Sequence, residues 1–252
     1  MHKRLALCVG INDYPGSGSD LSGCVNDATS WTGLLDSLGY EVITLLDGQA
    51  TRANVVQQLR DAMLNLKFAD RFIFTYSGHG SWIPDREGDE ADARDEVLVM
   101  HDWESQGFLS DDDLFGIYQN RHYGVRVTAI SDSCYSGTVA RAFGEGVYKQ
   151  PRFFPPDLLV PGATDRVLPR GRNLGSRPGT VLLSGCADDE VSYDAYLDGR
   201  YQGAMTHAAM STFAPGQSMH EWHKAIRLRL PNATYDQTPQ LQATYWQRRW
   251  SL

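Results

Sequence analysis

The feature that most constrains the fold is a repeated succession of short apolar segments and longer segments with the apolar spacing of amphipathic helices. The predicted strands are 4–11, 40–46, 71–76, 97–100, 125–130 and 180–184. The predicted helices are 25–38, 51–66, 110–119 and 218–229. Strands that alternate with helices predict an α/β fold, whose sheet is mostly parallel with helices on both faces.

Local signals support the helix boundaries. Thr51 and Ser110 are the first residues of two predicted helices, where a hydroxyl can accept a hydrogen bond from a free backbone N–H group. Gly39 follows the first predicted helix and indicates its end.

Composition limits the classes of partner. The chain has 252 residues, of which 42% are apolar, so it can build a real core. Its formal net charge is −8, and no basic patch stands out in the sequence, which disfavours nucleic-acid binding. No apolar run approaches the ~20 residues that a membrane-spanning helix needs.

The N-terminal sequence superficially resembles a secretion signal, because basic residues precede the run LALCVGI. The run is short, however, and it ends in Asn12 and Asp13 without a small-residue cleavage site. We therefore expect a cytoplasmic protein whose four cysteines are free thiols rather than disulfides.

A cysteine and a histidine occupy equivalent places in the predicted sheet. Cys134 follows the strand 125–130 within ISDSCYSG, and His79 follows the strand 71–76 within SGHG. If these strands are parallel neighbours, both side chains open at the same edge, where ligands bind in α/β sheets. A thiol and an imidazole within reach of each other form a nucleophile and its base. Considered alone, a cysteine at a strand end is more often inert.

The order of the motifs resembles that of the metacaspases. The matching stretches are CVGINDY, LSGCVNDA, FTYSGHG, DEVLVMHDW, SDDDL, AISDSCYSG, LLSGCADDE, GAMT and QTPQL. These are caspase-like cysteine peptidases of clan CD, family C14, and this chain resembles the prokaryotic type without a prodomain. The resemblance implies a three-layer caspase-like sandwich with a six-stranded, mostly parallel sheet.

The resemblance also implies the catalytic groups. His79 would be the general base and acid, and Cys134 the nucleophile. The backbone N–H groups of Gly80 and Cys134 would form the oxyanion hole. One departure is Tyr135, where the family commonly has histidine, and we expect no loss of activity from it.

Three further residues match the pocket for the substrate residue before the scissile bond: Asp27, Ser77 and Asp132. Two carboxylates in one concave site favour the planar donor fork of arginine, then lysine, and repel acidic residues. The alternative for Asp132 is a loop cap that accepts backbone N–H groups. The alternative for Asp27 is a charge that favours the helix dipole.

Acidic residues crowd the segments 85–96 and 111–113, as in a site for a hard cation. By the resemblance, Asp95, Asp111 and Asp112 match calcium ligands of calcium-activated members. A fourth ligand position is Arg141 here, which puts calcium in doubt, because arginine could neutralise the aspartates instead. The other interpretation of 111–113 is the acidic first turn of a helix. We therefore expect no required cofactor.

The segment 141–179 is rich in proline, glycine and arginine and has little periodicity. We expect one catalytic domain over 1–252, with a large-subunit-like part (1–140), this flexible linker, and a small-subunit-like part (180–252). By the resemblance, the linker is a candidate for self-cleavage, and Lys149, Arg170 and Arg172 are the possible sites because they look the most exposed of its basic residues. It could equally be a solvated loop or a lid over the site.

The sequence thus predicts a monomeric cysteine endopeptidase that cleaves peptides and proteins after arginine or lysine, through a thioester on Cys134. The alternatives are a catalytically silent caspase-like module that binds peptides and a calcium-binding regulatory module. We expect neither nucleic-acid nor membrane partners.

Overall fold

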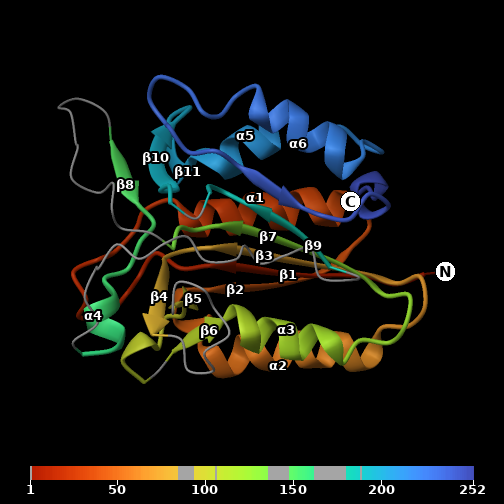
Figure 1. Ribbon diagram of the computed structural model, residues 1–252, viewed down its shortest axis with the longest axis horizontal. Coiled ribbons are helices and arrows are strands. Elements are labelled where there is room, and N and C mark those ends of the chain that lie inside the picture. The colour runs from red at the N-terminus through yellow and green to blue at the C-terminus, as the bar shows by residue number, and fades with distance from the viewer. Residues whose placement is uncertain (1, 85–93, 106, 136–147, 162–179, 188) are drawn as a thin grey trace.

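The structure is a computed structural model in which residues 2–84, 94–105, 107–135, 148–161, 180–187 and 189–252 are described. A central sheet runs through the middle of the molecule between two layers of helices (Figure 1). Its strands lie in the order β12-β9-β7-β3-β1-β2. Their bounds are Arg4–Gly10 (β1), Glu41–Leu46 (β2), Arg71–Ser77 (β3), Arg126–Asp132 (β7), Thr180–Ser184 (β9) and Gln240–Gln242 (β12).

Five of these strands are parallel, and only β12, at the edge, runs antiparallel to its neighbour β9. The prediction of a six-stranded, mostly parallel sheet is therefore confirmed. The membership differs in one place, because the predicted strand 97–100 lies outside this sheet and β12 was not predicted. Apolar patterning identifies a strand without specifying its partner.

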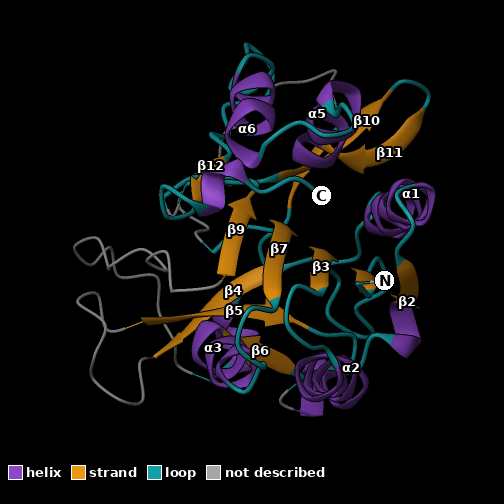
Figure 2. Ribbon diagram, turned by 90° about the vertical axis from the view of Figure 1, so that its right-hand side faces the viewer, coloured by secondary structure: helices purple, strands orange, loops and turns teal. Residues whose placement is uncertain are grey.

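Helices cover both faces of the sheet (Figure 2). The helices α1 (Cys24–Ser37), α5 (Ala204–Thr212) and α6 (Met219–Arg227) lie on one side. The helices α2 (Arg52–Asn65) and α3 (Asp111–Gln119) lie on the other. Both predicted caps form, since Thr51 and Ser110 accept hydrogen bonds from backbone N–H groups in the first turns of α2 and α3.

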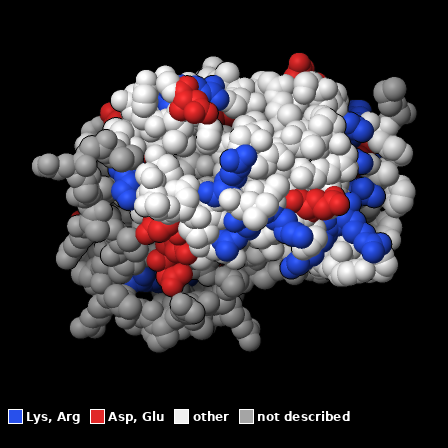
Figure 3. All heavy atoms as spheres, turned by 90° about the horizontal axis from the view of Figure 1, so that it is seen from above, with Lys and Arg blue, Asp and Glu red and all other residues white. Residues whose placement is uncertain are grey.

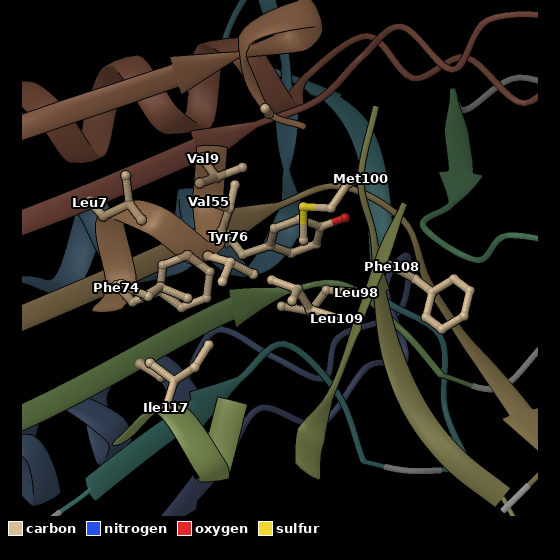
Figure 4. Close-up of a cluster of buried hydrophobic side chains, with 14 of the residues drawn as sticks. Leu7, Val9, Val55, Phe74, Tyr76, Leu98, Met100, Phe108, Leu109 and Ile117 are labelled. Carbon is tan, nitrogen blue, oxygen red and sulfur yellow. The ribbon is translucent and has the colours of Figure 1, made fainter. Parts of the chain in front are cut away.

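The strand pleat divides the apolar residues between two cores. In β1, Leu7 and Val9 belong to the core beneath α2 and α3, whereas Ala6 and Cys8 belong to the core beneath α1, α5 and α6. Figure 4 shows part of the first core, where Phe74 and other side chains from the sheet converge with Val55 and Ile117 from the helices. Burial on both faces explains why the parallel strands are nearly continuous apolar runs.

Two small antiparallel sheets flank the carboxyl ends of the parallel strands. The first has the order β4-β5-β6, with bounds Gly80–Pro84, Arg94–Val99 and Phe108–Ser110. The second has the order β11-β10-β8, with bounds Arg200–Gly203, Tyr193–Leu197 and Lys149–Pro151. The remaining short helices are Asp47–Gln49 (η1), Trp103–Ser105 (η2), Pro156–Leu159 (α4) and Gln247–Arg249 (η3).

The predicted linker 141–179 is not structureless throughout. It contains β8, which pairs with β10, and α4, which packs near β4. The prediction of an unstructured segment is therefore wrong for 148–161. Short strands rich in proline and lysine lack the apolar periodicity that sequence analysis detects.

The outer face of α6 carries mixed charge. Figure 3 looks onto this side of the molecule, where lysine and arginine side chains gather beside a smaller group of acidic ones, and α6 ends in a basic last turn. Lys224 and Arg227 stand at that helix terminus, where positive charge is favoured by the helix dipole. Among the described residues, no helix combines the length and the apolarity needed to span a bilayer.

The close packing of α1 on β1 predicts a strict requirement for glycine at position 10. A Cβ atom there would overlap the carbonyl oxygen of Cys24 and lie 2.7 Å from the Cβ of Ala28. We expect Gly10→Ala to lower the free energy of unfolding by about 1–3 kcal/mol in urea titrations. The matched control is Gly33→Ala, on the exposed side of α1, where no atom lies within 4 Å. It should raise stability by up to ~1 kcal/mol, and equal effects of both substitutions would contradict the packing argument.

Candidate active site

The sheet register places His79 and Cys134 at equivalent positions. Strands β3 and β7 are parallel neighbours, and their last residues, Ser77 and Asp132, are register partners. His79 and Cys134 each follow two residues later, and both are buried. The register therefore brings the two segments together at the carboxyl edge of the sheet, as the sequence predicted.

Glycine at position 80 lets these two segments touch. A Cβ atom there would overlap the carbonyl oxygen of Cys134. Backbone alone can approach so closely, which is why glycine stands next to the histidine.

Two backbone N–H groups at this junction converge on a single carbonyl oxygen. The N–H groups of Gly80 and Cys134 donate to the carbonyl oxygen of Arg152, at 3.0 and 3.3 Å. The N–H group of Arg152 donates in turn to the carbonyl oxygen of Ser192, at 2.9 Å. The peptide unit of Arg152 is therefore held on both sides, directly beside the thiol-bearing residue.

The side chain of Arg152 fills a pocket of three carboxylates. Its Nη2 lies 2.7 Å from Oδ2 of Asp27 and 2.9 Å from Oδ1 of Asp194, and its Nη1 lies 3.4 Å from Oδ2 of Asp132. Both Arg152 and the three aspartates are essentially inaccessible to solvent. A charged arginine is seldom buried completely, and here its charge is matched by acidic partners.

Other groups fix the carboxylates in place. Asp132 accepts hydrogen bonds from the hydroxyl of Ser192 and from the backbone and hydroxyl of Thr206. Asp27 accepts from the N–H group of Gly203, at 3.0 Å. Glycine is needed at position 203, because a Cβ atom would overlap Oδ2 of Asp132 and lie 2.6 Å from Nη1 of Arg152.

Asp194 is the pocket residue that sequence reasoning missed. It accepts hydrogen bonds from the N–H groups of Ser22 and Gly23, so it also holds the loop before α1. The available signal was an aspartate inside the apolar and aromatic segment 191–197, where a strand would bury it. Ser77, the third predicted pocket residue, is buried beside Asp132 in register, but its hydroxyl has no hydrogen-bond partner among the described residues.

The imidazole of His79 is oriented by its surroundings. Its Nε2 lies 2.6 Å from the carbonyl oxygen of Ser19, so Nε2 carries the hydrogen and donates it. In the neutral ring, Nδ1 is then the basic nitrogen, and it has no hydrogen-bond partner within the described part of the chain. The rings of Tyr14 and Phe154 lie against the imidazole, with centroids 4.7 and 5.6 Å away.

Burial shifts the protonation equilibria of this site. It lowers the pKa of His79 to about 4, against the opposing influence of the carbonyl groups of Ser19 and Arg152. Burial also raises the pKa of the Cys134 thiol to about 12. At neutral pH the pair is therefore an uncharged thiol and an uncharged imidazole while Arg152 occupies the site.

In the pocket, burial raises the pKa of Asp27 to about 7, although the Arg152 guanidinium opposes the rise. The neighbouring Asp132 carboxylate adds to it. Three carboxylates surround one guanidinium, so a proton on Asp27 relieves part of the excess negative charge.

The predicted metal ligands do not form a cluster. In the described ranges, no group of three or more His, Cys, Asp or Glu side chains could hold a metal ion. Asp95 lies in β5, whereas Asp111 and Asp112 stand in the first turn of α3. These three residues therefore do not complete a calcium site by themselves, and Arg141 and most of the acidic segment 85–96 lie outside the described residues.

The predicted self-cleavage residues have different placements. Lys149 is half-buried in β8, and its Nζ lies 3.2 Å from the carbonyl oxygen of Thr234. It is therefore not the freely exposed residue that was expected. Arg170 and Arg172 lie outside the described residues. All four cysteines are free and buried, as predicted for thiols without disulfides.

The comparisons with known proteins agree on one family. A sequence profile described as "Metacaspase, peptidase C14 domain" matches residues 3–142. Metacaspase-1 of Cryptococcus neoformans is 34% identical over 96% of this chain, which spans 63% of that relative's length. Metacaspase-1 of Saccharomyces cerevisiae is 31% identical over 96% of this chain and 67% of its own length. The crystal structure of protein GSU0716 from Geobacter sulfurreducens is similar with a TM-score of 0.73 and 31% identity, over 95% of this chain and 92% of that one.

Proposed function

Because the chain belongs to the metacaspase family of cysteine peptidases, we propose that it is an endopeptidase that cleaves after arginine or lysine. One observation carries the proposal. The guanidinium of Arg152 lies among three buried aspartates while its carbonyl oxygen accepts from the N–H groups of Gly80 and Cys134. A substrate arginine bound in the same way presents its carbonyl carbon to the nucleophile.

In the proposed reaction, the sulfur of Cys134 attacks that carbonyl carbon. Nδ1 of His79 takes the thiol proton, because Nε2 is already protonated and bonded to Ser19. The imidazolium then protonates the departing amine, which leaves a thioester on Cys134. Water hydrolyses the thioester and restores the thiol.

The N–H groups of Gly80 and Cys134 are the proposed oxyanion hole. Both already point at a carbonyl oxygen, at distances of 3.0 and 3.3 Å. Such fixed donors stabilise the negative charge that develops on that oxygen in the tetrahedral intermediate.

The pocket supports a preference for basic residues. The two terminal nitrogens of a guanidinium meet Asp132 on one side, and Asp27 and Asp194 on the other. The flat fork of arginine satisfies both sides together, whereas lysine brings one compact charge. A substrate aspartate or glutamate would be repelled by the three carboxylates.

The residues before the cleaved bond are proposed to bind as an added strand. β8 pairs antiparallel with β10, and this strand leads directly into Arg152. Peptides that extend an exposed sheet edge gain main-chain hydrogen bonds of the same kind. The proposed partners are accordingly peptide or protein segments that are extended around a basic residue.

In the proposed acyl transfer, His79 accepts the thiol proton and donates it to the departing amine. No proposed step uses a metal ion as an acid or a base. Self-processing within 141–179 is a further part of the proposal, since that segment supplies Arg152.

A panel of fluorogenic peptides tests the function. Peptides that end in Arg or Lys should be hydrolysed, those that end in Asp should not, and Cys134→Ala should abolish turnover. The assays are run with added calcium and with a chelator, at matched concentrations. An absence of turnover with every peptide in both conditions would instead support a silent peptide-binding module.

Asp194→Asn tests the residue that the sequence did not reveal. Loss of one charge from a buried ion-pair network should reduce kcat/KM for an arginine peptide by about 100-fold or more, mainly through KM. The matched control is Asp198→Asn, which alters an exposed aspartate beside His207. If both variants behave like wild type, Asp194 does not contribute to the pocket.

The contacts of Lys149 predict a second preference, for lysine at the substrate residue three positions before the basic residue. Its ammonium lies 5.0 Å from the centre of the Tyr193 ring and near the Thr234 carbonyl oxygen. A Lys-Gln-Pro-Arg reporter should therefore have a kcat/KM about tenfold higher than the same peptide with norleucine at its first position. Tyr193→Phe should retain this preference, and Tyr193→Leu should reduce it. Equal rates with both peptides would show that no such subsite exists.

A further inference from the structure

We propose that residues 149–154, the bound segment, are an intramolecular substrate that closes the active site until the peptide bond between Arg152 and Phe153 is hydrolysed. The inference rests on the proposed peptidase function and adds the regulation of the same site. Arg152 was not among the residues that the sequence indicated for self-cleavage.

The part of the bound segment before Arg152 is held along the whole proposed substrate path. Lys149, Gln150 and Pro151 are register partners of residues in β10. Nε2 of Gln150 donates to the carbonyl oxygen of Asp20, at 2.8 Å. The N–H group of Arg152 completes the series by donating to Ser192. A free peptide cannot add to this edge of β10 while β8 occupies it.

The part after Arg152 is held equally well. The N–H group of Phe154 donates to the carbonyl oxygen of Gly80, and its carbonyl oxygen accepts from the hydroxyl of Ser81, both at 2.8 Å. The Phe154 ring is completely buried against Tyr14, His79 and Trp103. The bond between Arg152 and Phe153 is therefore fixed from both sides, between the thiol and the imidazole segments.

A tethered occupant competes strongly with free substrates. Being part of the same chain gives the bound segment an effective concentration in the millimolar range or higher. Arg152 and the pocket aspartates are inaccessible to solvent, so a substrate arginine can enter only after Arg152 leaves. The same burial keeps Cys134 and His79 uncharged, and their pKa values should return toward ordinary values once water enters.

Hydrolysis of this bond follows the balance of the general reaction. The Cys134 sulfur forms a thioester with the Arg152 carbonyl carbon as the carbon–nitrogen bond to Phe153 breaks. The thiol proton passes through His79 to the Phe153 nitrogen. Water then adds to the thioester, which yields an Arg152 carboxylate and the restored thiol, while the new amine of Phe153 is protonated. One water molecule is consumed, and no oxidant or reductant is needed.

Intact-mass analysis of the full chain tests the cleavage. Purified wild type should convert with time into two fragments, one ending at Arg152 and one beginning at Phe153. Cys134→Ala and Arg152→Gln should keep that bond intact, and Arg152→Lys should still be cut there. The charge-matched control is Arg60→Gln, on an exposed arginine of α2, which should be cut like wild type. Because the event is intramolecular, its half-time should not change over a 100-fold range of protein concentration.

Turnover of the Lys-Gln-Pro-Arg reporter tests the closure. Wild type should show a lag that ends as the Arg152–Phe153 bond disappears. Arg152→Gln should show no lag and an initial rate at least tenfold above that of uncut wild type. Thermal melting with and without agmatine, a free guanidinium compound, shows whether this variant folds and whether its emptied pocket binds a replacement cation.

Three results would overturn the inference: full activity of uncut wild type, activation that accompanies a cut at another bond alone, or a half-time that shortens in proportion to concentration. Each of them leaves the proposed peptidase function standing, because basic reporters are still hydrolysed. Failure of wild type, of Arg152→Gln and of Arg152→Lys to hydrolyse any basic reporter would instead refute the peptidase function itself. The concentration series uses only wild type, so it decides the question even if Arg152→Gln does not fold.

Discussion

The buried charge cluster around Arg152 is the interaction on which the arrangement of the site depends. Its three aspartates come from α1, the end of β7 and β10, which are far apart in the chain. Each carboxylate also receives hydrogen bonds from further segments, so that the cluster ties the loop before α1 to the start of α5. Removing one member of a buried ion network leaves a charge without a partner, at a cost of about 3–5 kcal/mol. The central sheet positions these segments, and the charge cluster holds the loop before α1, the start of α5 and β10 together at its edge.

The sheet register explains why the reactive pair and the pocket are inseparable. Strand β7 ends in Asp132 and reaches Cys134 two residues later, so one segment supplies both a pocket carboxylate and the thiol. Strand β3 runs beside it and delivers His79 at the same level. A shift of one residue between these parallel strands would turn every side chain to the opposite face. The continuous apolar burial of both strands prevents such a shift.

Much of this arrangement could be predicted from the sequence. The alternating apolar runs predict the sheet, and the positions of His79 and Cys134 after two such runs predict their meeting. Asp194 and Arg152 could not be found in this way, because their contacts join residues up to 172 positions apart in the chain. The composition around Arg152 is typical of a solvated loop, whereas the residue is buried by charge pairing rather than by apolar patterning. The strand at 97–100 was recognised as a strand but joins a side sheet, since pairing partners are set by tertiary contacts.

The pKa of Asp27 bears on the selectivity for basic residues that we propose for the pocket. Burial and the nearby Asp132 raise this pKa to about 7 even with a guanidinium present. A bound guanidinium lowers this pKa through its attraction for the carboxylate, so binding of a basic group and protonation of Asp27 oppose each other. We therefore expect binding of an arginine substrate to strengthen as pH rises through the pKa of the open pocket and to weaken as pH falls below it. In the proposed binding mode, the same cation neutralises the cluster and places its own carbonyl group beside Cys134, so protonation of the pocket opposes alignment of the scissile bond.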